Sequence, residues 1–427
     1  MSKLGNRSKY KIVQLVTIIV SFSLLLVGCA GGVSTSGGPL AVKNVITVQT
    51  ADPSGAQAQA LAAFGEQLFA QVKDGSDVNP VISPLSVFYA LAMADEGAKD
   101  STADAFTQVL GMPVDQARQV AAYLLTALDN RAQGTTVNVA NSAWLDDSLK
   151  ANQDWVDQIS AYYQAAVFNT DLQAPATVDA VNQWISDKTN KMIPQMLQTI
   201  DSSAVALLIN ALYLNATWAT QFNTDNTSDQ MFTMASGSTA TVPFMTMYAS
   251  TQNVIDTDSA QGVVLPYQDG RLAFMAVMPK SGELSLSGDT LSQLLSAATQ
   301  TDNVVLSMPK FHTEFGTTDL VPALTKLGLG VAFDPGTANL TGLGSSDGRP
   351  LYIGSVLHKV SISVGEKGTE AAAATVVEIM AGSAPLAQPL VIDFNRPYIY
   401  AVVDTQTGVP LFIGAMDDPS KAPPTVN

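Results

Sequence analysis

The feature that most constrains the fold is an almost unbroken apolar run from Val205 to Leu214, in which Asn210 is the one polar residue. A strand that exposes one face to water alternates polar and apolar residues, whereas a strand buried on both faces is apolar throughout. The run therefore predicts a central strand, buried on both faces, in the middle of a sheet.

The spacing of apolar residues changes at this run. Before it, they recur at three- and four-residue steps, as Leu61, Phe64 and Leu68 do, which is the period of a helix with one buried face. After it, short apolar stretches dominate, and Asp269-Gly270 separates two of them as a hairpin turn would. Helices first and strands later, without strict alternation, predict an α+β fold. The predicted helices span 58–72, 83–93, 102–110, 114–130, 154–163, 178–197 and 320–327, and the predicted strands span 205–214, 263–267, 272–279, 356–364, 390–394, 398–403 and 410–415.

The N-terminus has the organisation of an export signal. Basic residues precede an apolar run over 12–27, and the run ends at Cys29. A basic end, a short apolar core and a small-residue exit are typical of a secretory signal. Leu26-Val27-Gly28-Cys29 resembles the bacterial lipobox, so we expect residues 1–28 to be removed as a lipoprotein signal peptide and Cys29 to be lipidated. Cys29 is the only cysteine, which excludes a disulfide within the chain.

Composition divides the rest of the chain. Gly and Ser are frequent after Cys29, so residues 29–54 are predicted to be a flexible tether. The body then spans 55–419, roughly 365 residues, which is large enough for one multi-layered domain or for two domains. Residues 420–427 form a C-terminal tail. A hydrophobic content of 47% allows a large core, and a net charge of −16 argues against nucleic acid and anionic lipid as partners.

Candidate catalytic groups are few. The chain has two histidines, His312 and His358, and no nucleophile elbow, zinc-protease motif or phosphate-binding glycine loop. The carboxylate pairs Asp146-Asp147 and Asp417-Asp418 stand in turn-like contexts and are most simply solvated. No nucleophile, base and orienting group can be assembled from these residues. We therefore expect no enzyme activity, no metal and no cofactor.

The segment from 366 to 385 is unusual because it is rich in alanine and its pattern is compatible with either a helix or a strand. Alanine favours a helix, but the β-branched residues Val376, Val377 and Ile379 crowd the end of that helix. With a period of two, Thr369 and the alternate residues up to Ile379 form an uncharged face that starts with small side chains, while both glutamates fall on the other face. Periodicity alone leaves helix and strand open.

Several motifs in the right order resemble one family. The segment 366–375, Glu-Lys-Gly-Thr-Glu-Ala-Ala-Ala-Ala-Thr, is similar to the proximal hinge of inhibitory serpins. The resemblance covers almost the whole body, and its further motifs are Asn79-x-x-Ile82-Ser83-Pro84-Leu85-Ser86, Val181-Asn182-x-Trp184-Ile185, Asn210-Ala211-Leu212-Tyr213-Leu214 with Trp218, Phe394-Asn395-Arg396-Pro397-Tyr398 and Leu411-Phe412-Ile413-Gly414.

The resemblance implies one α+β domain of the serpin fold, with three β-sheets, eight or nine helices and an exposed reactive loop. It also implies a mechanism in which a protease cleaves the loop and forms an acyl-enzyme. The freed loop then inserts as an extra strand of the largest sheet and distorts the protease, so that the inhibitor is consumed.

Individual positions take family roles through the same resemblance. The hinge comprises Glu366, Lys367, Gly368, Thr369, Glu370, Ala371, Ala372, Ala373, Ala374 and Thr375. The polar shutter beneath the sheet comprises Ser83, Ser86, Asn210 and His358. The breach, where insertion begins, comprises Trp218, Lys310 and Glu366, and we expect an ion pair between Lys310 and Glu366. Because the hinge is small and uncharged on its inward face, the resemblance implies an inhibitor rather than a substrate.

The scissile bond is assigned less narrowly. The family's spacing from Glu366 places it at Gly382-Ser383, whereas spacing from the C-terminal signature points nearer Leu386, and bonds at Met380 and Ala381 stay open. Lys and Arg are absent between 368 and 395, so a trypsin-like target is disfavoured and elastase-like or subtilisin-like serine proteases are expected. A papain-like cysteine protease is a further alternative.

Two other functions compete with inhibition. A non-inhibitory serpin would act as a carrier or chaperone, and a solute-binding lipoprotein would show two lobes of alternating α/β structure. We expect an extracytoplasmic, membrane-anchored monomer that is held by the lipid on Cys29 and forms a covalent acyl complex with its target protease.

Overall fold

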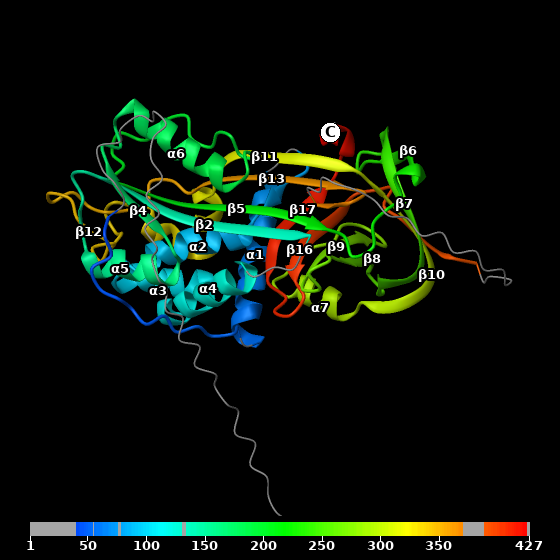
Figure 1. The fold of residues 1–427 in the computed structure, drawn as a ribbon, viewed down its shortest axis with the longest axis horizontal. Coiled ribbons are helices and arrows are strands. Elements are labelled where there is room, and N and C mark those ends of the chain that lie inside the picture. The colour runs from blue at the N-terminus through cyan, green and yellow to red at the C-terminus, as the bar shows by residue number, and fades with distance from the viewer. Residues whose placement is uncertain (1–39, 54, 76–77, 130–133, 370–387, 425–427) are drawn as a thin grey trace, which may run out of the picture.

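The computed structural model describes residues 40–53, 55–75, 78–129, 134–369 and 388–424. Over these residues the chain forms eight α-helices and three β-sheets. Most helices precede the strands in the sequence, and Figure 1 shows helices gathered around α2 below one long sheet, with α6 above it. The α+β class expected from the sequence is confirmed.

The helices are α1 (Gly55–Asp74), α2 (Pro84–Asp95), α3 (Asp100–Leu110), α4 (Val114–Asp129), α5 (Gln153–Tyr162), α6 (Pro175–Lys188), α7 (Thr290–Ser296) and α8 (Val321–Leu324). Helix α2 is buried along nearly all of its length. Ser83 caps its first turn, since the side chain accepts a hydrogen bond from Ser86 N at 3.2 Å, and Pro84 suits the first helical position because its missing N–H would have no partner there.

Two predicted helices extend too far. The helix predicted over 178–197 ends with α6 at Lys188, because Asn190 and Lys191 adopt left-handed backbone angles, with φ of 49° and 67°. The helix predicted over 320–327 is α-helical only over α8 and continues as a wide π-type turn from Thr325, in which Gly328 has a φ of 113°.

The six-stranded sheet has the order β11-β13-β14-β5-β2-β4. Its strands are β11 (Phe311–Asp319), β13 (Leu357–Gly365), β14 (Gly368–Thr369), β5 (Ala206–Thr217), β2 (Thr135–Asp146) and β4 (Ala166–Thr170). The apolar run of the sequence is the core of β5, which pairs with β2 along most of its length. Helix α2 packs against one face of β5 and α6 against the other, which explains why the strand is apolar on both sides.

The nine-stranded sheet has the order β1-β17-β16-β9-β8-β7-β10-β15, with β6 paired to β7. Its strands are β1 (Val81–Ile82), β17 (Pro410–Met416), β16 (Tyr398–Asp404), β9 (Leu272–Pro279), β8 (Ala260–Pro266), β7 (Thr239–Asp256), β10 (Thr299–Pro309), β15 (Leu390–Asp393) and β6 (Thr227–Thr233). The predicted hairpin at Asp269-Gly270 is confirmed as the turn between β8 and β9. The third sheet pairs β12 (Gly344–Ser345) with β3 (Lys150–Ala151).

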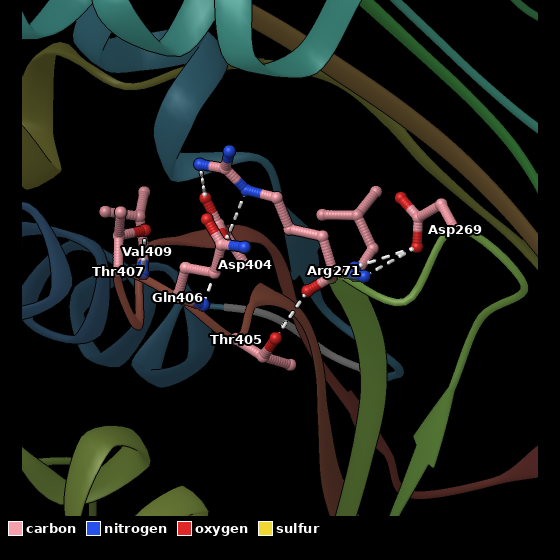
Figure 2. A network of polar contacts seen from close by, with 8 residues as sticks. Asp269, Arg271, Asp404, Thr405, Gln406, Thr407 and Val409 are labelled. Carbon is pink, nitrogen blue, oxygen red and sulfur yellow. Dashed lines mark hydrogen bonds and ion pairs between the residues drawn. The ribbon is translucent and has the colours of Figure 1, made fainter. Parts of the chain in front are cut away.

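A buried ion pair joins the start of β9 to the end of β16 (Figure 2). Arg271 donates from Nε to Asp404 Oδ1 at 2.9 Å and from Nη2 to Oδ2 at 2.5 Å, and Asp404 is 0% exposed. Gln406 N donates to the same Oδ1 at 3.0 Å. Both carboxylate oxygens therefore have donors, which a buried charge needs if it is not to destabilise the fold.

Residues 40–53, part of the predicted tether, lie against the body. The backbone N–H groups of Lys43 and Asn44 donate to the buried carboxylate of Asp157 at 3.0 and 3.1 Å, and Leu40 N donates to Val167 O on the edge strand β4. At the other end of the chain, Ala422 is 0% exposed. The described parts of the predicted tether and tail are therefore attached to the body. The signal peptide, Cys29 and the rest of the tether lie outside the described residues.

One large hydrophobic cluster runs from α1 and α2 through both large sheets, and a smaller cluster lies around α6. The described residues thus form a single domain rather than the two alternating α/β lobes of a solute-binding lipoprotein. Among these residues, no helix is both long and apolar enough to cross a membrane.

Candidate functional site

The strand β14 follows β13 after a short turn and lies between β13 and β5 in the six-stranded sheet. Thr369 pairs with Val364 of β13 and with Ala216 of β5, and both pairings are antiparallel. A Cβ on the neighbouring Gly368 would lie 2.0 Å from the carbonyl oxygen of Ala216, so only glycine allows the strand to come this close. Thr369 is 1% exposed, and its hydroxyl lies 2.5 Å from the hydroxyl of Tyr267.

Trp218 holds the turn that precedes β14. Its backbone N–H donates to Lys367 O at 2.9 Å, and its indole Nε1 donates to Gly365 O at 2.8 Å. The ring stacks on Tyr267, with centroids 4.7 Å apart and an angle of 8° between the planes. These contacts fix the direction in which the chain enters the sheet.

Glu366 is the charged group of the same turn. Its carboxylate lies 2.9 Å from Lys310 Nζ and accepts a hydrogen bond from Thr227 Oγ1 at 2.8 Å. Burial alone would raise the pKa of Glu366, but the hydrogen bonds from Lys310 and Thr227 outweigh it and hold that pKa below its usual value. The ion pair expected from the sequence is therefore present, and it keeps the carboxylate of Glu366 ionised.

The first turn of α2 holds the strands on both sides of the entry point. Ser83 N donates to His358 Nε2 of β13 at 3.0 Å, and Ser86 Oγ hydrogen-bonds Asn210 Oδ1 of β5. Asn210 Nδ2 in turn donates to Asn141 Oδ1 of β2 at 2.8 Å. Hydrogen bonds thus link Ser83, Ser86, Asn210 and His358, which come from three distant segments of the sequence.

His358 is neutral in this arrangement. Burial lowers its pKa to about 4, and accepting a hydrogen bond at Nε2 requires an unprotonated nitrogen. His358 is 4% exposed, so a charge there would have neither water nor an anion nearby. The histidine therefore serves as a hydrogen-bond acceptor.

In the described residues β5 and β13 are joined through β14 and α2 rather than by a ladder of their own. A small cavity of about 70 Å³ lies where α2 meets the start of β5 and the approach to β13, and Ala94, Leu208 and Val356 are among its lining residues. Among the interior boundaries of this sheet, the one between β5 and β13 is thus where an added strand would break the fewest backbone hydrogen bonds.

Part of the expected site lies outside the described residues: the hinge residues Glu370, Ala371, Ala372, Ala373, Ala374 and Thr375, and the reactive-bond candidates Met380, Ala381, Gly382, Ser383 and Leu386. Three polar partners were missed from the sequence, namely Thr227, Tyr267 and Asn141. No sequence signal identified them, because each is an ordinary strand residue that reaches the site only through sheet pairing. No group of three or more potential metal ligands occurs in the part of the chain that the structure describes.

The comparisons with known proteins agree with this architecture. A family model for serpins (serine protease inhibitors) matches residues 59–419. Serpin-ZXA of Oryza sativa subsp. japonica is 31% identical over 369 residues, which cover 81% of this chain and 91% of the rice protein. The native state of tengpin, a thermophilic serpin, matches with a TM-score of 0.80 and 31% identity, over 87% of this chain and 96% of tengpin.

The latent state of tengpin matches less closely, with a TM-score of 0.74 and 29% identity, over 88% of this chain and 100% of tengpin. The described fold is therefore nearer to the native state than to the latent state of the same relative. Because the family model matches residues 59–419 and the match to native tengpin covers 87% of this chain, the chain belongs to the serpin family.

Proposed function

We propose that this serpin irreversibly inhibits proteases that cleave after small or medium apolar residues, and that it traps the acyl-enzyme by inserting its cleaved loop between β5 and β13. The observation that carries the proposal is β14, a two-residue strand that already lies between these strands and runs antiparallel to both. Insertion would extend this short strand rather than start a new one.

The register of β14 supports a specific path for the hinge. Thr369 opposes Ala216 and Val364, so position 375, six residues further on, would oppose positions 210 and 358 if the same antiparallel pairing continued. Those positions are Asn210 and His358, the two residues held by the first turn of α2. Six strand residues span roughly 20 Å, so the hinge would reach from the breach to the shutter.

The side chains of the hinge suit this path. Thr369 faces the interior, and a period of two would place Ala371, Ala373 and Thr375 on the same buried face. None of them is charged or bulky, so their burial leaves no unpaired charge. This pattern favours inhibition over a carrier or chaperone role.

The loop also limits the target. With neither Lys nor Arg between 368 and 395, the loop offers no cation to a protease pocket that carries a carboxylate. We therefore propose elastase-like or subtilisin-like serine proteases as targets, with papain-like cysteine proteases as the alternative, and Gly382-Ser383 as the first candidate bond.

The test is to mix the protein with elastase-, subtilisin-, trypsin- and papain-like enzymes and to look for a complex that survives denaturing electrophoresis. We expect such a complex with at least one of the first two enzymes, and sequencing of the released fragment identifies the scissile bond. Clean cleavage by every enzyme without any complex would overturn the proposal.

We further propose that the protein is a monomeric, extracytoplasmic lipoprotein held to a membrane through Cys29. The support is the sequence of residues 1–29, which ends in a lipobox-like motif. Metabolic labelling with a fatty acid should mark the native chain but not the Cys29→Ser variant. Equal labelling of both chains, or of neither, would contradict the anchor.

A further inference from the structure

Two acidic residues are buried next to each other at the C-terminal end of α2. Asp95 is 3% exposed, and the side chain of Glu96 is 2% exposed. They are the last residue and the C-cap of the helix, where the unpaired carbonyl groups of the helix disfavour negative charge. Neither residue belongs to the site described above.

Among the described residues, one cation, Arg118, contacts the pair, and it does so at Glu96. Arg118 of α4 places Nη2 2.8 Å from Glu96 Oε2, and the hydroxyl of Tyr163 donates to Glu96 Oε1 at 2.9 Å. Asp95 Oδ2 is buried and has no hydrogen-bond partner among the described residues, and the same holds for Arg118 Nε. Glu96 therefore takes the available donors, and Asp95 is left incompletely paired.

In the part of the chain that the structure describes, the other residues that act on the pair are acidic or neutral. Helix α4 contributes Arg118 and a further acid, Asp115, and the end of α5 contributes the Tyr162 ring, 5.6 Å from the guanidinium. The neutral Gln158 accepts from Arg118 Nη1 at 3.4 Å. The acids of α3, Asp100 and Asp104, are exposed to solvent.

Other buried carboxylates in the described residues are paired differently. Asp404 has both oxygens bound by Arg271 (Figure 2). Glu66 accepts three backbone N–H groups, from Gly288, Thr290 and Leu291. Asp157 accepts from two backbone N–H groups and from the side-chain amides of Asn44 and Gln153. Each of these carboxylates has hydrogen-bond donors on both of its oxygens, whereas Asp95 Oδ2 has none among the described residues.

Two close, buried carboxylates with one guanidinium retain a proton, because ionising both leaves an unpaired charge in a poorly solvated site. In agreement with this geometry, burial raises the pKa of Asp95 and that of Glu96 to about 7 each. The charge of Glu96 raises the pKa of Asp95 further, so ionisation of Glu96 disfavours ionisation of Asp95.

The position of the pair connects it to the sheet. Its helix, α2, holds β5 and β13 through its first turn, and the pair at the opposite end joins α2 to α4 and to the residue after α5. Trp155 of α5 adds a further link, since Nε1 donates to Met93 O at 3.0 Å. If this end of α2 were less firmly attached, the helix could shift, and the hydrogen bonds from its first turn to β5 and β13 would weaken.

We propose that Asp95 and Glu96 form a proton-dependent latch, in which one retained proton leaves a single negative charge for Arg118 to neutralise, and release of that proton to solvent at alkaline pH weakens the attachment of α2 to α4 and α5. As a consequence, which rests on the proposed function, the sheet opens more readily when the proton has left.

The sign of the pH effect follows from the direction of the shift. A carboxyl in the unfolded chain loses its proton near pH 4, whereas the native pair keeps one until about pH 7. Between these values the native state binds more protons than the unfolded chain does, so its stability falls as the pH rises through this window and is level above it.

The first test detects the proton directly in the full-length protein. Infrared difference spectra should show the C=O band of a protonated carboxylic acid at pH 6, and the band should disappear by pH 8.5. The Asp95→Asn variant should lack this band at pH 6. The matched control is Asp157→Asn, in which the band should stay, because Asp157 is buried but ionised.

The second test measures the melting temperature as a function of pH. Asp95→Asn should melt higher than the wild type at pH 8.5, by about 3 °C, and should match it near pH 4. Asp157→Asn should instead melt lower than the wild type at pH 8.5, because it removes an acceptor that is fully used. If Asp95→Asn does not fold, Glu96→Gln and the wild-type infrared titration test the same proton.

The outcomes separate this proposal from the proposed function. A wild type without an acid band at pH 6, or an Asp95→Asn variant with the wild-type pH profile of melting, would overturn the latch even if proteases are trapped normally. Conversely, the band and the shifted profile without any trapped protease would support the latch and contradict the inhibitor. If both hold, spontaneous loss of inhibitory activity should be faster at pH 8.5 than at pH 6 in the wild type, and this difference should shrink in Asp95→Asn.

Discussion

The two polar clusters along the boundary between β5 and β13 differ in kind. The breach is built around an ion pair, Lys310–Glu366, with side chains that are 26% and 11% exposed, and β14 has already entered there. The shutter consists of neutral groups, and His358 within it is kept uncharged by burial.

The difference shows how one sheet can be closed and yet ready to open. A partly hydrated ion pair can be broken at little cost in free energy, because water and salt ions replace the lost partner of each charge. A buried neutral network must be broken as a unit, because each group left without a partner costs about 1–3 kcal/mol. Under the proposed mechanism, the breach is therefore suited to the first step of insertion and the shutter to the step that limits it.

The largest effect is expected from a charge on the inward face of the hinge. Thr369→Arg would require a guanidinium in a site that is 1% exposed and lies against Tyr267. We expect the loop to be cleaved as before while the yield of covalent complex falls more than about tenfold, since burial of an unpaired charge costs several kcal/mol. Electrophoresis of timed mixtures measures both quantities, with Thr369→Ser as the control. A normal complex yield would mean that insertion does not pass this position.

The next effect concerns the shutter and has a defined pH window. The pKa of His358 is about 4 in the fold and about 6.5 in an unfolded chain. The contribution of neutral His358 to the free energy of unfolding is therefore fully present above pH 6.5. It falls as the pH decreases to 4, by about 3 kcal/mol in total.

Acidification in the same window also protonates the pair of Asp95 and Glu96, which raises the stability of the fold. This gain opposes the loss of stability that protonation of His358 causes. The loss should therefore be clearest in Asp95→Asn, by equilibrium unfolding between pH 7 and 4.5. Adding His358→Gln, which keeps a hydrogen-bond acceptor but does not titrate there, should reduce the loss. An unchanged slope in the double variant would show that His358 is not the titrating group.

The smallest effect is expected at the breach. Lys310→Met removes an ion pair that is only partly exposed to solvent, so we expect a loss of about 1 kcal/mol that shrinks at high salt. The matched control is Lys150→Met, which removes the more exposed pair with Asp347 and should change almost nothing. A loss at Lys310 as large as that at the shutter would contradict the contrast between the two clusters.

The sequence predicted the fold well where one physical cause acts alone. The apolar run at Val205–Leu214 became β5, and Asp269-Gly270 became a hairpin turn, because burial and turn chemistry are local in the sequence. The strands β2, β6, β7 and β10 were not predicted. Their residues mix polar and apolar types, since β7 changes partners along its length and its buried face changes with them.

The candidate site was predictable only through resemblance. Nothing in the spacing of Ser83, Asn210 and His358 indicates that they meet, because the contact depends on the order of strands in the sheet. No sequence pattern indicates that Asp95 and Glu96 are buried, since adjacent acids are normally solvated. Only the packing of α4 and α5 over the end of α2 makes their burial visible.

The central claim is that the loop enters the sheet between β5 and β13 once it has been cut. The most direct measurement is the melting temperature before and after a single cleavage of the loop by a protease that is not trapped. Insertion would add on the order of ten hydrogen bonds, or about 10 kcal/mol, so we predict a sharp rise in the wild type and little or no rise in Thr369→Arg. A cleaved wild type that melts at the temperature of the intact protein would contradict the account.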